Sequence, residues 1–257
     1  MVLGCTRASS KLLAEWGGMS SSTTNDSVCP SPELLEIASD HGARGPVLIW
    51  RFAQPLRSIS SAIVGGGIGS CDWVLNMTVD PLYSRLDPAA HILEVARILM
   101  LEGNGLGLLT AVDVGMHTIG RSEGAVVYST VGVRLPVRAF DPHEALPPDK
   151  YSGSNSGGGA KPGTINLMCF VGQNLSDAAL VNAVATVTEA KTQALFDRGV
   201  PGTGTASDAV CVLCPPNGTE DIFGGPRSYW GARLAAATYY SVVSGIDRQR
   251  EVDGTSA

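Results

Sequence analysis

The stretch from Gly163 to Asp208 limits the possible folds more than any other part of the chain, because it predicts a strand, a helix and a turn in direct succession. The apolar run T-I-N-L-M-C-F-V has the length and composition of a buried strand. A long segment rich in small residues follows it, and a Gly/Thr-rich turn, G-V-P-G-T-G-T-A-S-D, then ends at an acid. This unit contains an amide, a carboxylate, an ammonium and hydroxyls, which are the groups that a site for a large polar ligand needs.

The segment 177–198 is predicted to be a helix. Ser176 is a good N-cap, Asp177 complements the positive end of the helix dipole, and Gly199 with Pro201 ends the helical pattern. At about 100° per residue, one narrow stripe of this helix is polar and a broad arc is apolar. The stripe consists of Asn182, Thr186, Glu189 and Gln193.

Two charged residues of this helix are candidates for function. Glu189 has polar neighbours above and below it, so the stripe is either a solvated face or one wall of a site. Lys191 falls in the middle of the apolar arc, where its stem either snorkels to an edge or brings its charge against a group inside.

The strand, helix, strand order occurs twice, at 73–112 and at 164–213. Both units close on a hydroxyl and an acid, Thr110 with Asp113 and Ser207 with Asp208. We therefore expect a single α+β domain with mixed sheets and outer helices. A pseudo-duplicated β-α-β architecture is one interpretation of the repeat, and coincidence is the other.

The chain is expected to divide into an extension, a domain and a tail. Residues 1–43 form a loosely attached extension with a possible helix at 32–38, residues 44–250 form the domain, and residues 251–257 form the tail. The Pro/Gly/Ser-rich segment 141–162 is predicted to be a long mobile loop.

Composition excludes several classes of partner. A net charge of -6 without long charged runs argues against nucleic acid and anionic membranes as partners. The sequence contains no apolar stretch of about 20 residues and no signal-peptide pattern, which favours a cytoplasmic location. A homo-oligomer is compatible with the sequence.

Neither cysteine nor histidine predicts a metal site or a cofactor. Cys211 and Cys214 form a C-x-x-C, but they lie in a strand-like run and residues three apart in a strand face opposite sides. The four histidines lie in separate contexts without metal-ligand spacing. We therefore expect a structural role for the cysteines, no bound metal and no cofactor.

Several blocks of this sequence, taken together, resemble the adenosylcobinamide amidohydrolase family of corrinoid salvage. The similarity runs from about residue 47 to about residue 245, and the order and spacing of the blocks match. One departure is the T-x-T-D ending, which is T-A-S-D here, so that Ser207 keeps the hydroxyl of the usual threonine. Another is that the first forty or so residues and the loop 141–162 are longer than the family pattern. The matching blocks are W-R-F-x-x-P-L-R-S-I-S-S-A-I-V-G-G-G-I-G, T-A-V-D-V, G-T-I-N, T-E-A-K-T-Q-A-L and G-T-G-T-A-S-D-A-V.

The resemblance implies hydrolysis of the amide that joins aminopropanol to the corrin ring, with adenosylcobyric acid as the product. A corrinoid-binding or carrier module without hydrolysis is the rival interpretation, and an amidase for another substrate is a third. The sequence blocks do not separate these three functions.

Amide hydrolysis without a metal needs a base, donors for the oxyanion and an acid for the departing amine. We expect Glu189 or Asp208 as the base and Lys191 as the group that balances charge. Glycines 66 and 67 form either a tight turn or a backbone approach to the ligand. The expected substrate-binding residues are Asn166, Thr203, Thr205, Ser207, Asn76, Thr110, Asp113, Gly66 and Gly67, with the amides of Gly202 and Gly204 as further oxyanion donors.

Overall fold

The computed structural model describes residues 29, 31–38, 44–142 and 163–254. Within these ranges the eight strands form one mixed sheet in the order β4-β3-β2-β8-β7-β6-β5, with β1 beside β2. The elements are β1 (Glu33–Ala38), β2 (Arg44–Ser60), β3 (Gly67–Thr78), α1 (Pro88–Ile98), β4 (Gly105–Thr110), the 3-10 helix η2 (Val114–Met116), β5 (Thr118–Ser122), β6 (Ala125–Val131), β7 (Ile165–Val171), α2 (Asp177–Asp197), β8 (Ala209–Cys214) and α3 (Tyr229–Asp253).

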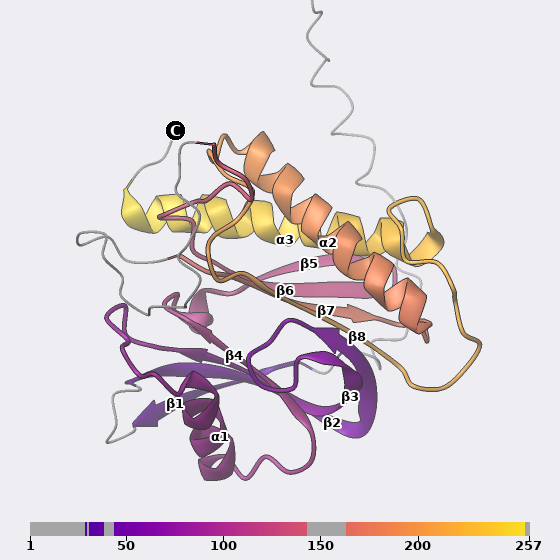
Figure 1. Ribbon diagram of the computed structural model, residues 1–257, viewed down its shortest axis with the longest axis horizontal. Helices are drawn as coiled ribbons and strands as arrows, with labels where there is room; N and C mark the ends of the chain where they lie inside the picture. Colours follow the sequence, from indigo (N-terminus) through magenta and orange to yellow (C-terminus); the bar gives the residue numbers. More distant parts are fainter. Residues whose placement is uncertain (1–28, 30, 39–43, 143–162, 255–257) are drawn as a thin grey trace, which may run out of the picture.

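The sheet folds back on itself, so that its two halves face each other. The ring of Trp50 in β2 lies 5.2 Å from that of Tyr128 in β6, although β8 and β7 separate these strands in the sheet order. Because side chains alternate along a strand, β2 places Leu48 and Trp50 between the two halves and Val47 and Ile49 against α1. The result is four layers, with α1 outside one half and α2 and α3 outside the other (Figure 1).

Strand β2 is long enough to belong to both halves. Its first part pairs with β1 and β3, and residues Arg57 to Ser60 pair with β8 as well as β3. The register with β3 shifts between Arg51 and Leu56, where Pro55 has no backbone N–H to donate. This irregularity allows one strand to bend from one half of the sheet into the other.

Two parallel β-α-β units build the core. Strands β3 and β4 are parallel and are joined through α1, and β7 and β8 are parallel and are joined through α2. This confirms an α+β fold, and both units of the expected repeat form parallel pairs. No helix in the described part of the chain is both long and apolar enough to cross a lipid bilayer.

Helix α2 follows its sequence signals closely. The Ser176 hydroxyl accepts a hydrogen bond from the N–H of Ala179 at 3.1 Å, and Gly199 lies just past the end with a φ of +66°. The buried face contains small and branched apolar residues together with Lys191, which is 6% exposed. The charge of Lys191 is therefore inside the protein and not at a solvated edge.

Three sequence-based boundaries need correction. The segment predicted as a helix before residue 38 is strand β1, because Leu35 and Ile37 alternate with exposed Leu34 and Glu36 and pack beside β2. Strand β2 runs without interruption from Arg44 to Ser60, and β5 was not predicted. Helix α3 continues to Asp253 and so includes the start of the expected tail, whereas residues 143–162 of the expected loop lie outside the described residues.

Truncation tests whether the extension is loosely attached. A chain that begins at residue 44 loses β1, its six paired positions on β2 and the cover that Leu35 and Ile37 provide. We expect it to unfold about 1–3 kcal/mol more easily than a chain that begins at residue 31, because it buries less apolar surface. Thermal unfolding followed by circular dichroism measures this difference. Equal melting temperatures would show that the whole of 1–43 is dispensable, as the composition suggested.

Candidate active site

A cavity of about 430 Å³ lies where the two β-α-β units meet. The segments that follow β3 and β4 form one side, and the residues at the starts of β7 and β8 form the other. Hydroxyl, amide and carboxylate groups line it together with small apolar side chains. The polar lining residues are Ser61, Asp80, Tyr83, Thr110, Thr164, Asn166, Ser207 and Asp208.

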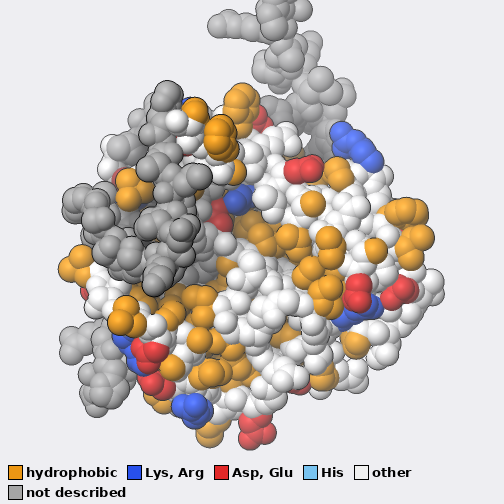
Figure 2. Space-filling model, viewed as in Figure 1, with side chains coloured by type: hydrophobic (Ala, Val, Ile, Leu, Met, Phe, Trp, Pro, Cys, Tyr) orange, Lys and Arg blue, Asp and Glu red, His pale blue; other side chains and the backbone are white. Residues whose placement is uncertain are grey.

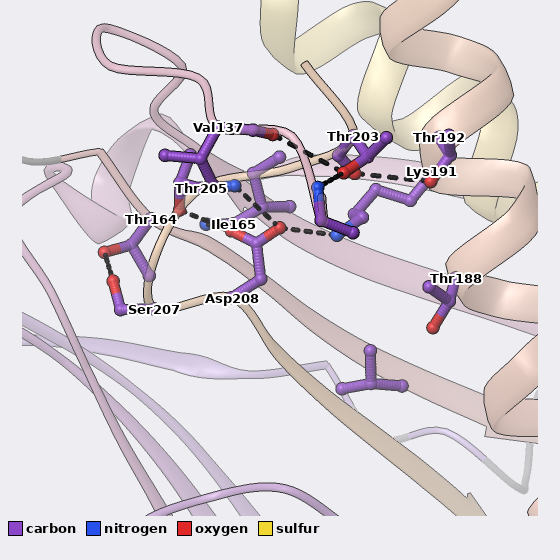
Figure 3. Close-up of polar contacts among 12 residues, drawn as sticks. Val137, Thr164, Ile165, Thr188, Lys191, Thr192, Thr203, Thr205, Ser207 and Asp208 are labelled. Carbon is purple, nitrogen blue, oxygen red and sulfur yellow. Dashed lines mark hydrogen bonds and ion pairs between the residues drawn. The ribbon is translucent and has the colours of Figure 1, made fainter. Parts of the chain in front are cut away.

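Asp208 and Lys191 form a buried ion pair at this cavity (Figure 3). Lys191 Nζ lies 2.5 Å from Asp208 Oδ2, and the exposed fractions of the two side chains are 8% and 12%. Asp208 accepts three further hydrogen bonds, from the Thr205 hydroxyl at 2.5 Å, from Thr205 N at 3.2 Å and from Ile165 N at 3.0 Å. Because a carboxylate has about four acceptor positions, these four donors engage all of them.

The Gly/Thr turn before β8 makes this contact possible. Gly204 lies so close to the pair that a Cβ at this position would be 2.3 Å from Asp208 Oδ2 and 2.7 Å from Lys191 Nζ. The turn is held from outside by Val137, whose N–H donates to Gly204 O at 2.9 Å and whose carbonyl accepts from Thr203 N at 2.8 Å. A side chain at residue 204 would therefore displace one of the two charged groups.

A pair of hydroxyls lies beside the carboxylate. Thr164 Oγ1 and Ser207 Oγ are 2.9 Å apart, and Ser207 also donates to the carbonyl of Gly163 at 3.3 Å. Thr164 is buried, whereas Ser207 is exposed. These residues bring a solvent-accessible hydroxyl to the cavity next to a buried charge pair.

Asn166 reaches the cavity from β7 and is held from the opposite half of the sheet. Its Nδ2 donates to Asn76 Oδ1 at 2.9 Å and to the carbonyl of Leu109 at 3.1 Å. Asn76 in turn donates to Thr130 Oγ1 at 3.2 Å. A buried polar ladder thus joins the two halves of the sheet behind the cavity.

The sequence model of the adenosylcobinamide amidohydrolase family matches residues 32–254. This chain belongs to that family. The match begins before β1, so the edge strand lies within the matched region.

Two relatives of this chain have the name of the same family. An adenosylcobinamide amidohydrolase of Methanosarcina mazei is 28% identical over 198 residues, which are 73% of this chain and 89% of that protein. One of Halobacterium salinarum is 36% identical over 142 residues, 54% of this chain and 58% of that protein. The solved structure of the PH0078 protein from Pyrococcus horikoshii OT3 aligns with 84% of this chain and 83% of its own at 10% identity, with a TM-score of 0.41.

The adenosylcobinamide amidohydrolase motifs do not all meet at the cavity. Asp208, Ser207, Asn166 and Thr110 line it, with Lys191 and Thr205 bonded to Asp208 and Asn76 bonded to Asn166. Five other expected site residues, Glu189, Asp113, Gly66, Gly67 and Thr203, do not line this cavity.

Glu189 does not share the cavity with Asp208. It is two residues from Lys191 on α2, which is a turn of about 200°, and its side chain is exposed. Of the polar stripe, Asn182, Glu189 and Gln193 are exposed, whereas the buried Thr186 donates to the carbonyl of Gly224 at 2.8 Å. The stripe is therefore mainly a solvated face of the helix in the described structure.

Asp113, Gly66 and Gly67 also lie outside the cavity lining. Asp113 is exposed, caps η2 by accepting from Gly115 N at 2.8 Å, and borders a smaller neighbouring cavity of about 180 Å³. Gly66 and Gly67 are exposed in the turn between β2 and β3, where Gly67 has a φ of +100°. The positive φ of Gly67 is a conformation that glycine adopts readily in a tight turn.

Three backbone amides of the Gly/Thr turn are engaged inside the protein. Gly202 N donates to Val200 O, Thr203 N to Val137 O and Thr205 N to Asp208. The Thr203 hydroxyl accepts from Ala139 N at 2.9 Å. These groups hold the turn in shape, so we do not retain them as oxyanion donors.

Sequence reasoning missed Ser61, Thr164 and two further polar residues of the cavity, Asp80 and Tyr83. Both follow β3 in the segment V-D-P-L-Y, a polar turn directly after a buried strand that could have pointed to them. The Tyr83 hydroxyl lies 3.0 Å from His91 Nδ1 on α1, and the two rings stack with an interplanar angle of 9°. Burial raises the pKa of Tyr83, so its hydroxyl keeps its proton at neutral pH.

The cysteines behave as core residues. Cys211 faces the space between the two halves of the sheet and Cys214 faces α2 and α3, as expected for residues three apart in a strand. Burial raises the pKa of Cys211 to about 12, so the thiol is not ionised at neutral pH. Among the described residues, no three His, Cys, Asp or Glu side chains lie together as a group that could hold a metal ion.

Charged side chains are scattered on the face of the protein seen in Figure 2. Blue and red side chains alternate there among uncoloured and hydrophobic ones, and no basic patch forms among the described residues of that face. A basic patch is what a site for nucleic acid requires.

Proposed function

We propose that this chain hydrolyses the amide between the corrin ring and the aminopropanol arm of adenosylcobinamide, and that it thereby serves cobamide salvage. Water supplies a hydroxyl to the carbonyl carbon, the C–N bond breaks, and a proton goes to the departing amine. The products are adenosylcobyric acid and aminopropanol. The observation that carries this proposal is the buried Lys191–Asp208 pair at the cavity, formed by two of the blocks that resemble the family.

Lys191 supplies positive charge where the reaction develops negative charge. An ammonium has three N–H donors, and Asp208 accepts one of them. In a site of low polarity, a cation held in place stabilises a developing oxyanion more strongly than it would in water. All four acceptor positions of Asp208 are already engaged, so none is left for water. The role of Asp208 in this proposal is to hold Lys191 in position.

The water-activating group is a different carboxylate in this proposal. Asp80 borders the cavity, and one of its oxygens accepts from Leu82 N at 2.7 Å, which leaves the other for water. Asp80→Asn tests this role directly. We expect that variant to lose turnover, because an amide does not take a proton from water.

Incubation with adenosylcobinamide followed by chromatography separates the proposed function from its rivals. A hydrolase converts the substrate to adenosylcobyric acid with release of aminopropanol. A corrinoid-binding or carrier module retains adenosylcobinamide unchanged, and an amidase for another substrate neither binds nor converts it but releases amine from other amides.

We expect turnover to persist in a chelator such as EDTA. The physical reason is the absence of a metal-ligand cluster among the described residues, so that charge stabilisation falls to Lys191. Rates measured with and without chelator check this expectation. Loss of activity on chelation, restored by one divalent ion, would contradict it.

A further inference from the structure

The hydrogen bonds of Asn166 determine which end of its carboxamide faces a ligand. Nδ2 has two hydrogens, and both are donated inside the protein, to Asn76 Oδ1 and to Leu109 O. Leu109 O is a backbone carbonyl and can only accept, so a flipped carboxamide would place two acceptors against each other. The orientation of Asn166 therefore follows from the chemistry of its neighbours.

The oxygen of Asn166 remains for the cavity. Asn166 is 1% exposed and borders the cavity, and no residue in the described parts of the chain donates to its Oδ1. A ligand that brings an N–H or O–H group to this point supplies a donor for Oδ1.

Asn76 is the residue that maintains this arrangement. It is fully buried, does not border the cavity, and is itself held by Thr130. Its carboxamide accepts from Asn166 on one side and donates to Thr130 on the other. Asn76 thus acts on the cavity only through Asn166.

We propose that Asn166 Oδ1 accepts a hydrogen bond from the N–H of the scissile secondary amide, with Asn76 as its positioning residue. This inference rests on the proposed function and names the chemical class that the site selects, a secondary amide in preference to an ester. In a trans amide the N–H and C=O bonds point in opposite directions. The carbonyl oxygen then points away from Asn166, toward the remaining polar groups of the cavity.

The first test does not depend on activity. In ¹⁵N NMR of the whole chain, the side-chain NH₂ of Asn166 should exchange slowly with solvent, because both hydrogens are buried and bonded. Asn76→Leu should accelerate that exchange at least tenfold, whereas Asn76→Asp keeps the acceptor and should not. Fast exchange in the unmodified protein, or no change in Asn76→Leu, would overturn the positioning role.

The second test compares a corrinoid amide with the matching ester of cobyric acid as inhibitors of turnover. The unmodified protein should bind the ester about tenfold more weakly, since one hydrogen bond of about 1.4 kcal/mol corresponds to a factor of ten. Asn166→Ala and Asn76→Leu should lose this preference. Thr130→Val removes the Thr130 end of the Asn166–Asn76–Thr130 ladder and is the matched control for stability. This variant should keep the preference for the amide.

The two tests distinguish the two proposals. If no corrinoid amide is hydrolysed but the NMR result holds, the proposed function fails and the acceptor role of Asn166 is tested with other secondary amides. If corrinoid amides are hydrolysed and the ester binds equally well, the function stands and the role of Asn166 is wrong. If Asn76→Leu lowers the melting temperature but leaves the preference for amide over ester unchanged, the Asn166–Asn76–Thr130 ladder has only a structural role.

Discussion

We expect Asp208→Asn and Lys191→Met each to lower the free energy of unfolding by about 3–5 kcal/mol, because each leaves an uncompensated charge in a buried site. Asp208→Asn also replaces an acceptor of four hydrogen bonds with a group that donates on one side. We expect turnover to fall roughly 10²–10³-fold in both variants, the size typical of the loss of one charge-stabilising group. Denaturant unfolding and steady-state rates measure the two effects separately.

The double variant Lys191→Met/Asp208→Asn shows whether the pair serves stability or chemistry. Removing both charges also removes the unpaired charge, so part of the lost stability should return while turnover stays low. If the double variant recovers activity together with stability, the ion pair is structural and the chemistry lies elsewhere.

Glu189→Gln tests the assignment that the sequence suggested. Because the Glu189 side chain is exposed on the opposite side of α2 from Lys191, we expect near wild-type stability and turnover. A loss of turnover in a folded Glu189→Gln protein would return this residue to the active site and would contradict the placement of the site at the cavity.

Gly204→Ala is the second change with a large expected effect. Its Cβ would lie 2.3 Å from Asp208 Oδ2 and 2.7 Å from Lys191 Nζ, so the two charged groups must separate or the turn must move. We expect about 1–3 kcal/mol of lost stability, the usual cost of overpacking, and at least a tenfold loss of turnover. Gly69→Ala is the matched control, because a Cβ there meets nothing within 4 Å.

Unfolding curves and rates of the two glycine variants are compared under the same conditions. Equal effects of Gly204→Ala and Gly69→Ala would show that the turn tolerates a side chain. The close approach of residue 204 to the ion pair would then not limit the reaction.

Local signals in the sequence were sufficient for the second β-α-β unit. The cap at Ser176, the stop at Gly199 and the unbroken apolar run of β7 depend on neighbours along the chain, and the structure places the elements within one or two residues of the prediction. The position of Lys191 in the apolar arc of α2 left two alternatives, and the structure shows its charge inside, paired with Asp208.

Edge strands were harder to predict, because their structure depends on a partner strand. The segment E-L-L-E-I-A has helix-forming residues, yet residues 33–38 form β1 because β2 offers a free edge. Strand β5 is five residues long with two buried positions that face α3, and its apolar pattern alone is too short to identify it.

The sequence by itself determined the α+β class, the long helix with a lysine in its apolar arc, and the hydroxyl, amide and acid groups at the ends of four strands. Only the tertiary structure decided which of these groups share a cavity. Asn76 and Asn166 are 90 residues apart, and Asp80 and Tyr83 are more than 100 residues from Asp208, so their meeting depends on how the two halves of the sheet fold against each other. The face of α2 that carries Glu189 depends in the same way on which side of the helix the sheet covers, a long-range contact that helical periodicity cannot specify.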